Sequence, residues 1–97
     1  MLESKVTKTV SMFGKELYTK EVIVPQEFNS SIDLETFSND MLRNSIRTLN
    51  SLGYSIPDMS KVNVMWHKSS IFNGYICLFG TKKGFVNTEF TLYCYEK

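Results

Sequence analysis

Alanine is absent from this 97-residue chain, and arginine, proline, cysteine and histidine are scarce. One histidine and two cysteines, with no Cys-x-x-Cys pair, give neither a zinc-ligand pattern nor a disulfide framework. No stretch approaches the ~20 apolar residues of a membrane-spanning helix, and the first residues lack the apolar run of a signal peptide. The sequence therefore predicts a cytoplasmic protein without a metal, a cofactor or a membrane segment.

Three of the absent or scarce residues share a feature at the level of the genetic code. Alanine, arginine and proline have GC-rich codons, whereas lysine and asparagine, which have AT-rich codons, occur nine and seven times. This bias indicates an AT-rich genome, such as those of low-GC bacteria and their phages. It concerns the origin of the chain and not its chemistry.

The overall composition is that of an ordinary globular protein. Apolar residues make up 42% and charged residues 22% of the chain, and the formal net charge is +1. A chain of this length has room for one hydrophobic core, so residues 1–97 are predicted to form a single domain. The near-zero net charge gives no general attraction to a polyanion.

The N-terminal part predicts a β-hairpin. Residues 5–13 and 16–24 are rich in β-branched and aromatic residues, and Gly14-Lys15 between them suits a two-residue turn. This register places Lys8 opposite Glu21. Pro25 lacks the amide donor of a ladder and is expected to end the second strand.

The next segment predicts an α-helix from Leu34 to Leu52. Its apolar residues recur at helical spacing: Leu34, Phe37, Met41, Leu42, Ile46, Leu49 and Leu52. Ser30, Ser31 or Asp33 can cap its start. Gly53 followed by Tyr54 is typical of a left-handed helix end.

Three further strands are predicted from Lys61 to His67, Gly74 to Thr81 and Phe85 to Tyr95. The fold class is therefore α+β, with a single helix packed on a five-stranded antiparallel sheet in the order ββαβββ. Lys82-Lys83-Gly84 reads as a three-residue turn that places Thr81 opposite Phe85.

That register sorts the side chains of the last hairpin onto two apolar faces. Cys77 and Cys94 fall on opposite faces, too far apart for a disulfide. One face carries the aromatic residues Tyr75, Phe79, Phe85 and Tyr93. Because one helix covers only one face of a sheet, these four residues are predicted to form a partner-binding patch.

The aromatic face has three interpretations. The chain can cover it with its own first hairpin, or leave it as exposed cross-strand pairs, since aromatic residues are favoured in strands regardless of function. A protein partner, including a second copy in a homodimer, is the next interpretation. Single-stranded nucleic acid stacking on the rings is the third, although the signature of RNA-binding sheets is absent and the net charge is low.

Candidate catalytic groups are few. His67 has no orienting partner or nucleophile in any recognisable pattern, and both cysteines lie in apolar strands where thiolates are disfavoured. No nucleotide-binding, hydrolase or metalloprotease motif is present. Arg43 and Arg47 lie one helical turn apart and form a secondary candidate partner-binding pair, although a solvated helix face explains them as well.

These observations favour a non-enzymatic protein-binding module, such as a phage-encoded inhibitor or accessory factor, with no catalytic residues. A single-stranded nucleic-acid-binding protein is the alternative, and a small enzyme ranks third. Binding of nucleic acid would weaken steeply with salt, which separates the first two.

Overall fold

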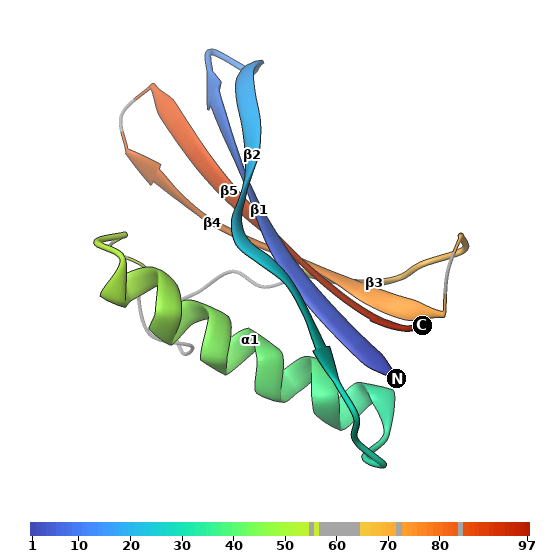
Figure 1. Cartoon of the computed structure of the whole chain (residues 1–97). Coiled ribbons are helices and arrows are strands. Elements are labelled where there is room, and N and C mark those ends of the chain that lie inside the picture. The colour runs from blue at the N-terminus through green and yellow to red at the C-terminus, as the bar shows by residue number, and fades with distance from the viewer. Residues whose placement is uncertain (55, 57–64, 72, 84) are drawn as a thin grey trace.

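A computed structural model describes all residues of the chain except 55, 57–64, 72 and 84. Five strands form one antiparallel sheet, and a single helix packs against it (Figure 1). The elements are β1 (Leu2–Met12), β2 (Lys15–Phe28), α1 (Leu34–Ser51), β3 (Met65–Lys68), β4 (Gly74–Lys83) and β5 (Val86–Glu96). The predicted α+β class and the order ββαβββ are confirmed.

The sheet order is β2-β1-β5-β4-β3, which places the first and last strands side by side at its centre. The strands β1 and β5 pair along their whole lengths, from Leu2 opposite Glu96 to Met12 opposite Val86. Both chain ends therefore lie together at one end of the sheet, where the Lys97 amide donates to the Met1 carbonyl (Figure 1). The turns of the two hairpins lie together at the opposite end.

The helix begins and ends where the sequence predicts. The Asp33 carboxylate accepts hydrogen bonds from the amide and the hydroxyl of Thr36, which lower the pKa of Asp33. At the other end Gly53 has a φ of 98°, and the Tyr54 amide donates to the Leu49 carbonyl. The predicted N-cap and left-handed C-terminal cap are both present.

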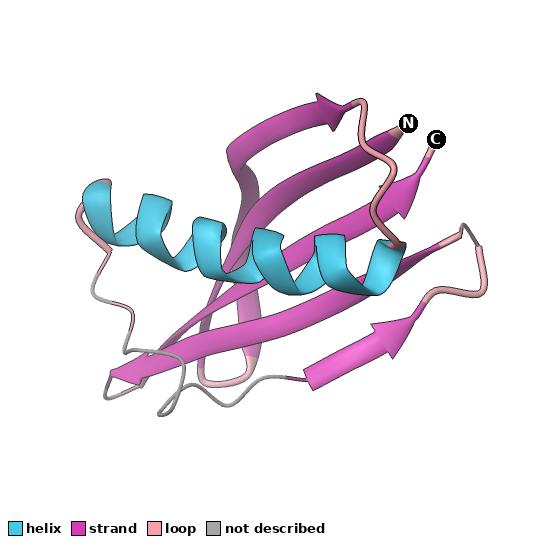
Figure 2. Ribbon diagram, turned by 90° about the horizontal axis from the view of Figure 1, so that it is seen from below, coloured by secondary structure: helices cyan, strands magenta, loops and turns pink. Residues whose placement is uncertain are grey.

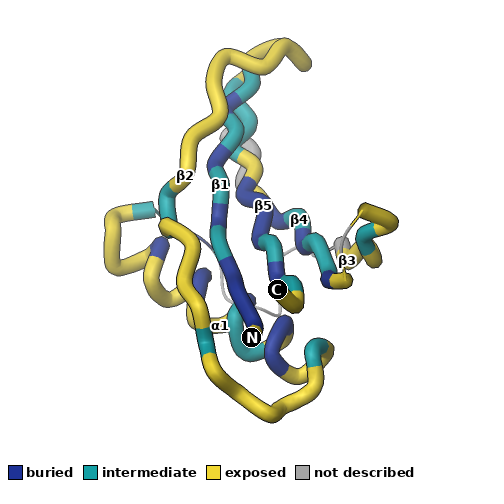
Figure 3. Tube along the Cα trace, turned by 45° about the vertical axis from the view of Figure 1, so that its right-hand side comes forward, coloured by how far each residue is buried: buried dark blue, intermediate teal, exposed yellow. Residues whose placement is uncertain are grey.

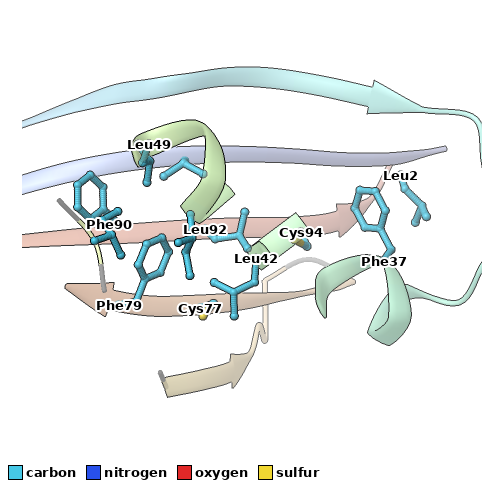
Figure 4. Close-up of a cluster of buried hydrophobic side chains, with 12 residues drawn as sticks. Leu2, Phe37, Leu42, Leu49, Cys77, Phe79, Phe90, Leu92 and Cys94 are labelled. Atoms are coloured by element: carbon cyan, nitrogen blue, oxygen red, sulfur yellow. The ribbon is translucent and has the colours of Figure 1, made fainter. Parts of the chain in front are cut away.

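The core lies between the helix and one face of the sheet (Figure 2). Phe37, Leu42, Ile46 and Leu49 are the apolar helix residues that are buried. They meet side chains of the three central strands, including Phe79, Phe90, Leu92, Cys77 and Cys94 (Figure 4). We call the face of the sheet that carries these residues and packs against the helix the inner face. The opposite face is the outer face.

The first hairpin differs from its predicted register. Its turn is Phe13-Gly14 and not Gly14-Lys15, and a register shift between Val10 and Ser11 then brings Lys8 opposite Lys20. The strand β2 also continues through Pro25 to Phe28. Proline is tolerated there because β2 is an edge strand and its register with β1 shifts at this point. Residues 61–64 of the strand predicted before His67 lie outside the described residues.

Lys8 is buried on the inner face, next to Val6 in the central strand β1. Its Nζ lies 5.5 Å from the ring centroid of Tyr18 and 4.8 Å from that of Tyr54. Burial acts to lower the pKa of Lys8, but hydrogen bonds and charge interactions with the two tyrosines outweigh it and raise the pKa. The two rings thus accommodate a charged group where the helix ends.

Candidate functional site

The register of the last hairpin separates the four residues predicted to form one aromatic patch. Thr81 lies opposite Thr88, where Phe85 was predicted, and Phe79 lies opposite Phe90. The difference is an odd number of residues, so every side chain of β4 changes face relative to β5. The predicted register is wrong, and with it the prediction of a contiguous patch.

Phe79 belongs to the core. Its side chain is 2% exposed, and its ring stacks on Phe90 with centroids 5.5 Å apart and an interplanar angle of 22° (Figure 4). Tyr75 also lies on the inner face, opposite Cys94, and is half-buried. Tyr93 lies opposite Ile76 on the outer face. Whether the exposed parts of Tyr75 and Tyr93 bind a partner stays a prediction.

The outer face of the sheet is a mixture of polar and apolar side chains. Along β1 it carries Glu3, Lys5, Thr7 and Thr9, and Lys5 places its Nζ 5.1 Å from the ring centroid of Tyr93. Burial, and then a hydrogen bond to Glu3, raise the pKa of Tyr95 to about 12. Polar and charged side chains of β1 therefore lie beside the tyrosine rings on the outer face. The sequence had predicted an apolar second face.

The fourth predicted residue, Phe85, lies in the turn between β4 and β5 and is 71% exposed. Its ring contacts that of Phe13, which is 75% exposed in the turn between β1 and β2, with centroids 5.0 Å apart. The Phe13 amide also donates to the Phe85 carbonyl at 3.4 Å. The turns of two separate hairpins are thus joined through a pair of aromatic rings at the end of the sheet.

Exposed apolar residues extend this pair into a surface. Met12 and Leu17 flank the first turn and are 38% and 54% exposed. We call Met12, Phe13, Leu17 and Phe85 the hairpin tip. The tip projects from the end of an elongated molecule of 42 × 27 × 21 Å, away from the helix (Figures 1 and 3).

The backbone at Phe13 is unusual. Its φ is 53°, and Gly14 follows with a φ of 77°. Two consecutive positive φ angles are required by the two-residue turn that matches the twist of a hairpin, which favours Asn-Gly. A bulky residue in this region costs on the order of 1–2 kcal/mol. The chain therefore carries a strained aromatic residue at a position where it is mostly in water.

A second feature lies at the other end of the β4–β5 hairpin. Trp66 of β3 and Tyr75 of β4 line a cleft of about 260 Å³ together with Glu35, Ser38 and Asn39 of the helix. The two rings are nearly perpendicular, with centroids 6.3 Å apart. Sequence reasoning missed both the cleft and the contact of Phe13 with Phe85, because each depends on a strand register that the sequence left ambiguous.

The arginine pair lies on the outer surface of the helix, as predicted. Arg43 and Arg47 are both exposed, and Arg43 is 3.8 Å from Asp40 in the ion pair expected from their spacing. Such an exposed pair contributes at most about 1 kcal/mol. Asn50, near the end of the same helix, forms two side-chain hydrogen bonds with the backbone of Ile56. A partner-binding role for the arginines stays a prediction.

Both cysteines are buried on the inner face and hold free thiols. The prediction that they point to opposite faces is wrong, since Cys77 lies opposite Leu92 and Cys94 opposite Tyr75. Burial raises the pKa of Cys77 to about 12, with a smaller contribution from Cys94. Burial also raises the pKa of Cys94 to about 12, against a hydrogen bond with Ser38 that lowers it.

These thiols are expected to resist alkylation in the folded protein. At pH 8 a rise in pKa from 9.0 to about 12 reduces the thiolate fraction about a thousandfold, and burial limits access further. Iodoacetamide should therefore modify the native protein at least ~100-fold more slowly than the protein in denaturant. Equal rates followed by mass spectrometry would show that the cysteines are accessible.

The raised pKa values of Cys77 and Cys94 also make the free energy of unfolding depend on pH. Below pH 9 the thiols are protonated in both states, so their titration has no effect. Between pH 9 and about 12 only the unfolded state ionises, and the free energy of unfolding falls with rising pH.

The exposed His67 lies opposite Ile76 on the outer face. In the described part of the chain, no three residues among His, Cys, Asp and Glu gather closely enough to hold a metal ion. No helix among the described residues is long and apolar enough to cross a membrane. Comparison with known proteins finds no matching family model, curated protein or solved structure.

Proposed function

We propose that this protein is a non-enzymatic protein-binding module that engages its partner through the hairpin tip. The observation that carries the proposal is the contact between Phe13 and Phe85, two aromatic rings held together by separate hairpins while both remain more than two-thirds exposed. Aromatic residues and methionine are enriched in the centres of protein interfaces. The tip supplies both.

The stability of the monomer gives no reason for this arrangement. An aromatic pair contributes about 0.5–1.5 kcal/mol, which is comparable to the cost of the left-handed backbone at Phe13. Asparagine at the same position would form the turn without strain. Strain retained at an exposed position is a mark of functional sites, because folding alone does not favour it.

The shape and size of the tip indicate the kind of partner. The four tip residues supply on the order of 400 Å², about half of one partner's share in a standard interface, since two aromatic rings bury ~150–250 Å² each at most. The tip is convex, so it fits a concave apolar pocket. Two copies meeting tip to tip would bury little, which favours a different protein over a homodimer.

Other parts of the chain agree with this proposal. The stacking surface predicted for single-stranded nucleic acid is not formed, because the register places Tyr93 on the outer face and buries Phe79 on the inner face. Buried thiols of raised pKa offer no nucleophile. Free cysteines also suit a reducing cytoplasm. A small module with one apolar projection suits an inhibitor or accessory factor, and the AT-rich coding fits a phage of a low-GC bacterium.

The proposal predicts which position of the chain captures a partner in the native host. A photoreactive phenylalanine analogue in place of Leu17 should cross-link one defined protein, because this exposed position lies near the start of β2, close in the chain to the turn that carries Phe13. The same analogue in place of Arg43, on the exposed helix surface, is the matched control and should cross-link none.

Affinity for the captured protein then tests the tip directly. The double variant Phe13→Asn with Phe85→Ser should lose at least ~100-fold in affinity, as expected for two central aromatic contacts, while its free energy of unfolding stays within about 1 kcal/mol of wild type. The variant Ile71→Ser removes an even more exposed apolar side chain away from the tip and should bind normally. Unchanged affinity of the double variant would refute the proposal.

A further inference from the structure

The cleft beside Trp66 has the elements of a ligand site. It lies where the start of α1 passes the edge strand β3, and its volume is about 260 Å³. Trp66 pairs with Cys77 and Lys68 pairs with Tyr75 in the β3–β4 ladder, so Trp66 and Tyr75 both point to the inner face. Figure 2 shows β3 at the edge of the sheet, beside the helix and not beneath it.

The two rings that line the cleft remain partly accessible. Trp66 is 36% exposed, and Tyr75 is half-buried. Their planes meet at 87°. Perpendicular rings cannot cover both of each other's faces, so the pair leaves ring faces that the two residues do not shield from each other.

The charge of the cleft is negative. Among the described residues, Glu35 is the single charged residue that lines the cleft, and its side chain has no hydrogen-bond or ion-pair partner there. The neighbouring Asp33 already accepts hydrogen bonds from Thr36 at the helix start. Lys68 lines the adjoining hollow together with Asp33 and Glu35, so its described lining holds two carboxylate residues and one lysine.

We propose that this cleft binds an organic cation, an ammonium or guanidinium group, held against the rings of Trp66 and Tyr75 and beside the Glu35 carboxylate. Aromatic faces attract cations through their quadrupoles, most strongly for tryptophan, and an adjacent carboxylate adds to the attraction. The site goes beyond the proposed function, because it lies at the end of β4 away from Phe85. Loss of either site leaves the other intact.

The binding is measurable through Trp66, the only tryptophan of the chain. Titration with trimethyllysine amide, arginine amide or choline should change its fluorescence saturably, with a dissociation constant on the order of 1 mM for such small ligands. Norleucine amide, which has a similar chain without the charge, should bind at least about fivefold more weakly. Equal binding of norleucine amide would overturn the proposal.

The source of the cation follows from the same titrations. Tighter binding of the two amino-acid amides than of choline assigns the site to a side chain of another protein, and the reverse assigns it to a small free cation. Either order supports the proposal. No saturable change with any of the three cations, checked by calorimetry, overturns it.

Two charge variants test the electrostatics in opposite directions. Glu35→Gln should weaken cation binding about two- to fivefold, whereas Lys68→Met should strengthen it by a similar factor. Opposite changes cannot arise from partial unfolding. Glu21→Gln, which removes an exposed carboxylate from the distant edge strand β2, is the matched control and should leave binding unchanged. Equal effects of Glu35→Gln and Glu21→Gln would overturn the assignment of the site.

Discussion

Replacing Phe79 by alanine is expected to lower the free energy of unfolding by about 3–5 kcal/mol, because the change removes a buried ring and leaves a cavity. Phe79 is 2% exposed and stacks on Phe90 beneath the helix. Small domains have only about 5–15 kcal/mol of total stability. The variant should therefore unfold at a much lower urea concentration in a denaturation experiment followed by circular dichroism.

Phe85→Ala is the matched control for this prediction. It deletes the same ring from a residue that is 71% exposed and loses only the contact with Phe13, so its cost should stay below about 1.5 kcal/mol. The register predicted from the sequence put both residues on one face and would make the two costs similar. Similar measured costs would therefore contradict the observed β4–β5 ladder.

Ile46→Ala in the helix is expected to lower the free energy of unfolding by about 2–5 kcal/mol. Ile46 is 7% exposed and belongs to the cluster that joins the helix to the sheet. Burial against a single helix is the main contact that holds the two layers together. The loss should appear as a shift in the midpoint of urea denaturation with little change in its slope.

Arg47→Ala, at the next position of the same helix, is the control because its side chain is exposed. It should change the free energy of unfolding by no more than about 0.5 kcal/mol. A loss of less than about 0.5 kcal/mol for Ile46→Ala as well would show that the apolar stripe of the helix is not the core.

The sequence was sufficient for the elements of the fold because their patterns are local. The helix follows from the spacing of Phe37, Ile46 and Leu49, and its ends follow from Asp33 and Gly53, which act within one turn. The strand order was left open. Pairing of β1 with β5 joins residues that are far apart in the sequence, from Leu2 with Glu96 to Met12 with Val86, and no local signal specifies such a contact.

Register was predicted less well than element type for a physical reason. The turns were placed from glycine, yet in the first hairpin Phe13 takes the left-handed position that glycine or asparagine normally fills. In the last hairpin both faces are apolar, so alternation does not say which face meets the helix. Phe79 was therefore placed in the partner-binding patch, although the helix covers it.

The candidate binding site differs from the predicted aromatic patch because the strand register differs from the predicted one. Of the predicted aromatic residues, Phe85 is the one that remains largely exposed. Its neighbour Phe13 is distant in sequence and could be found only through the contact between the two turns. Composition indicated that aromatic side chains matter for binding, but their grouping depends on tertiary structure.

The most direct test of the binding surface is amide hydrogen exchange of the protein alone and in complex with its cross-linked partner. Binding through the hairpin tip predicts slower exchange in residues 11–18 and 85–88, with exchange on the outer surface of α1 and at Tyr93 unchanged. Protection confined to the outer face around Tyr93, or to Arg43 and Arg47, with none in the two turns would contradict the account.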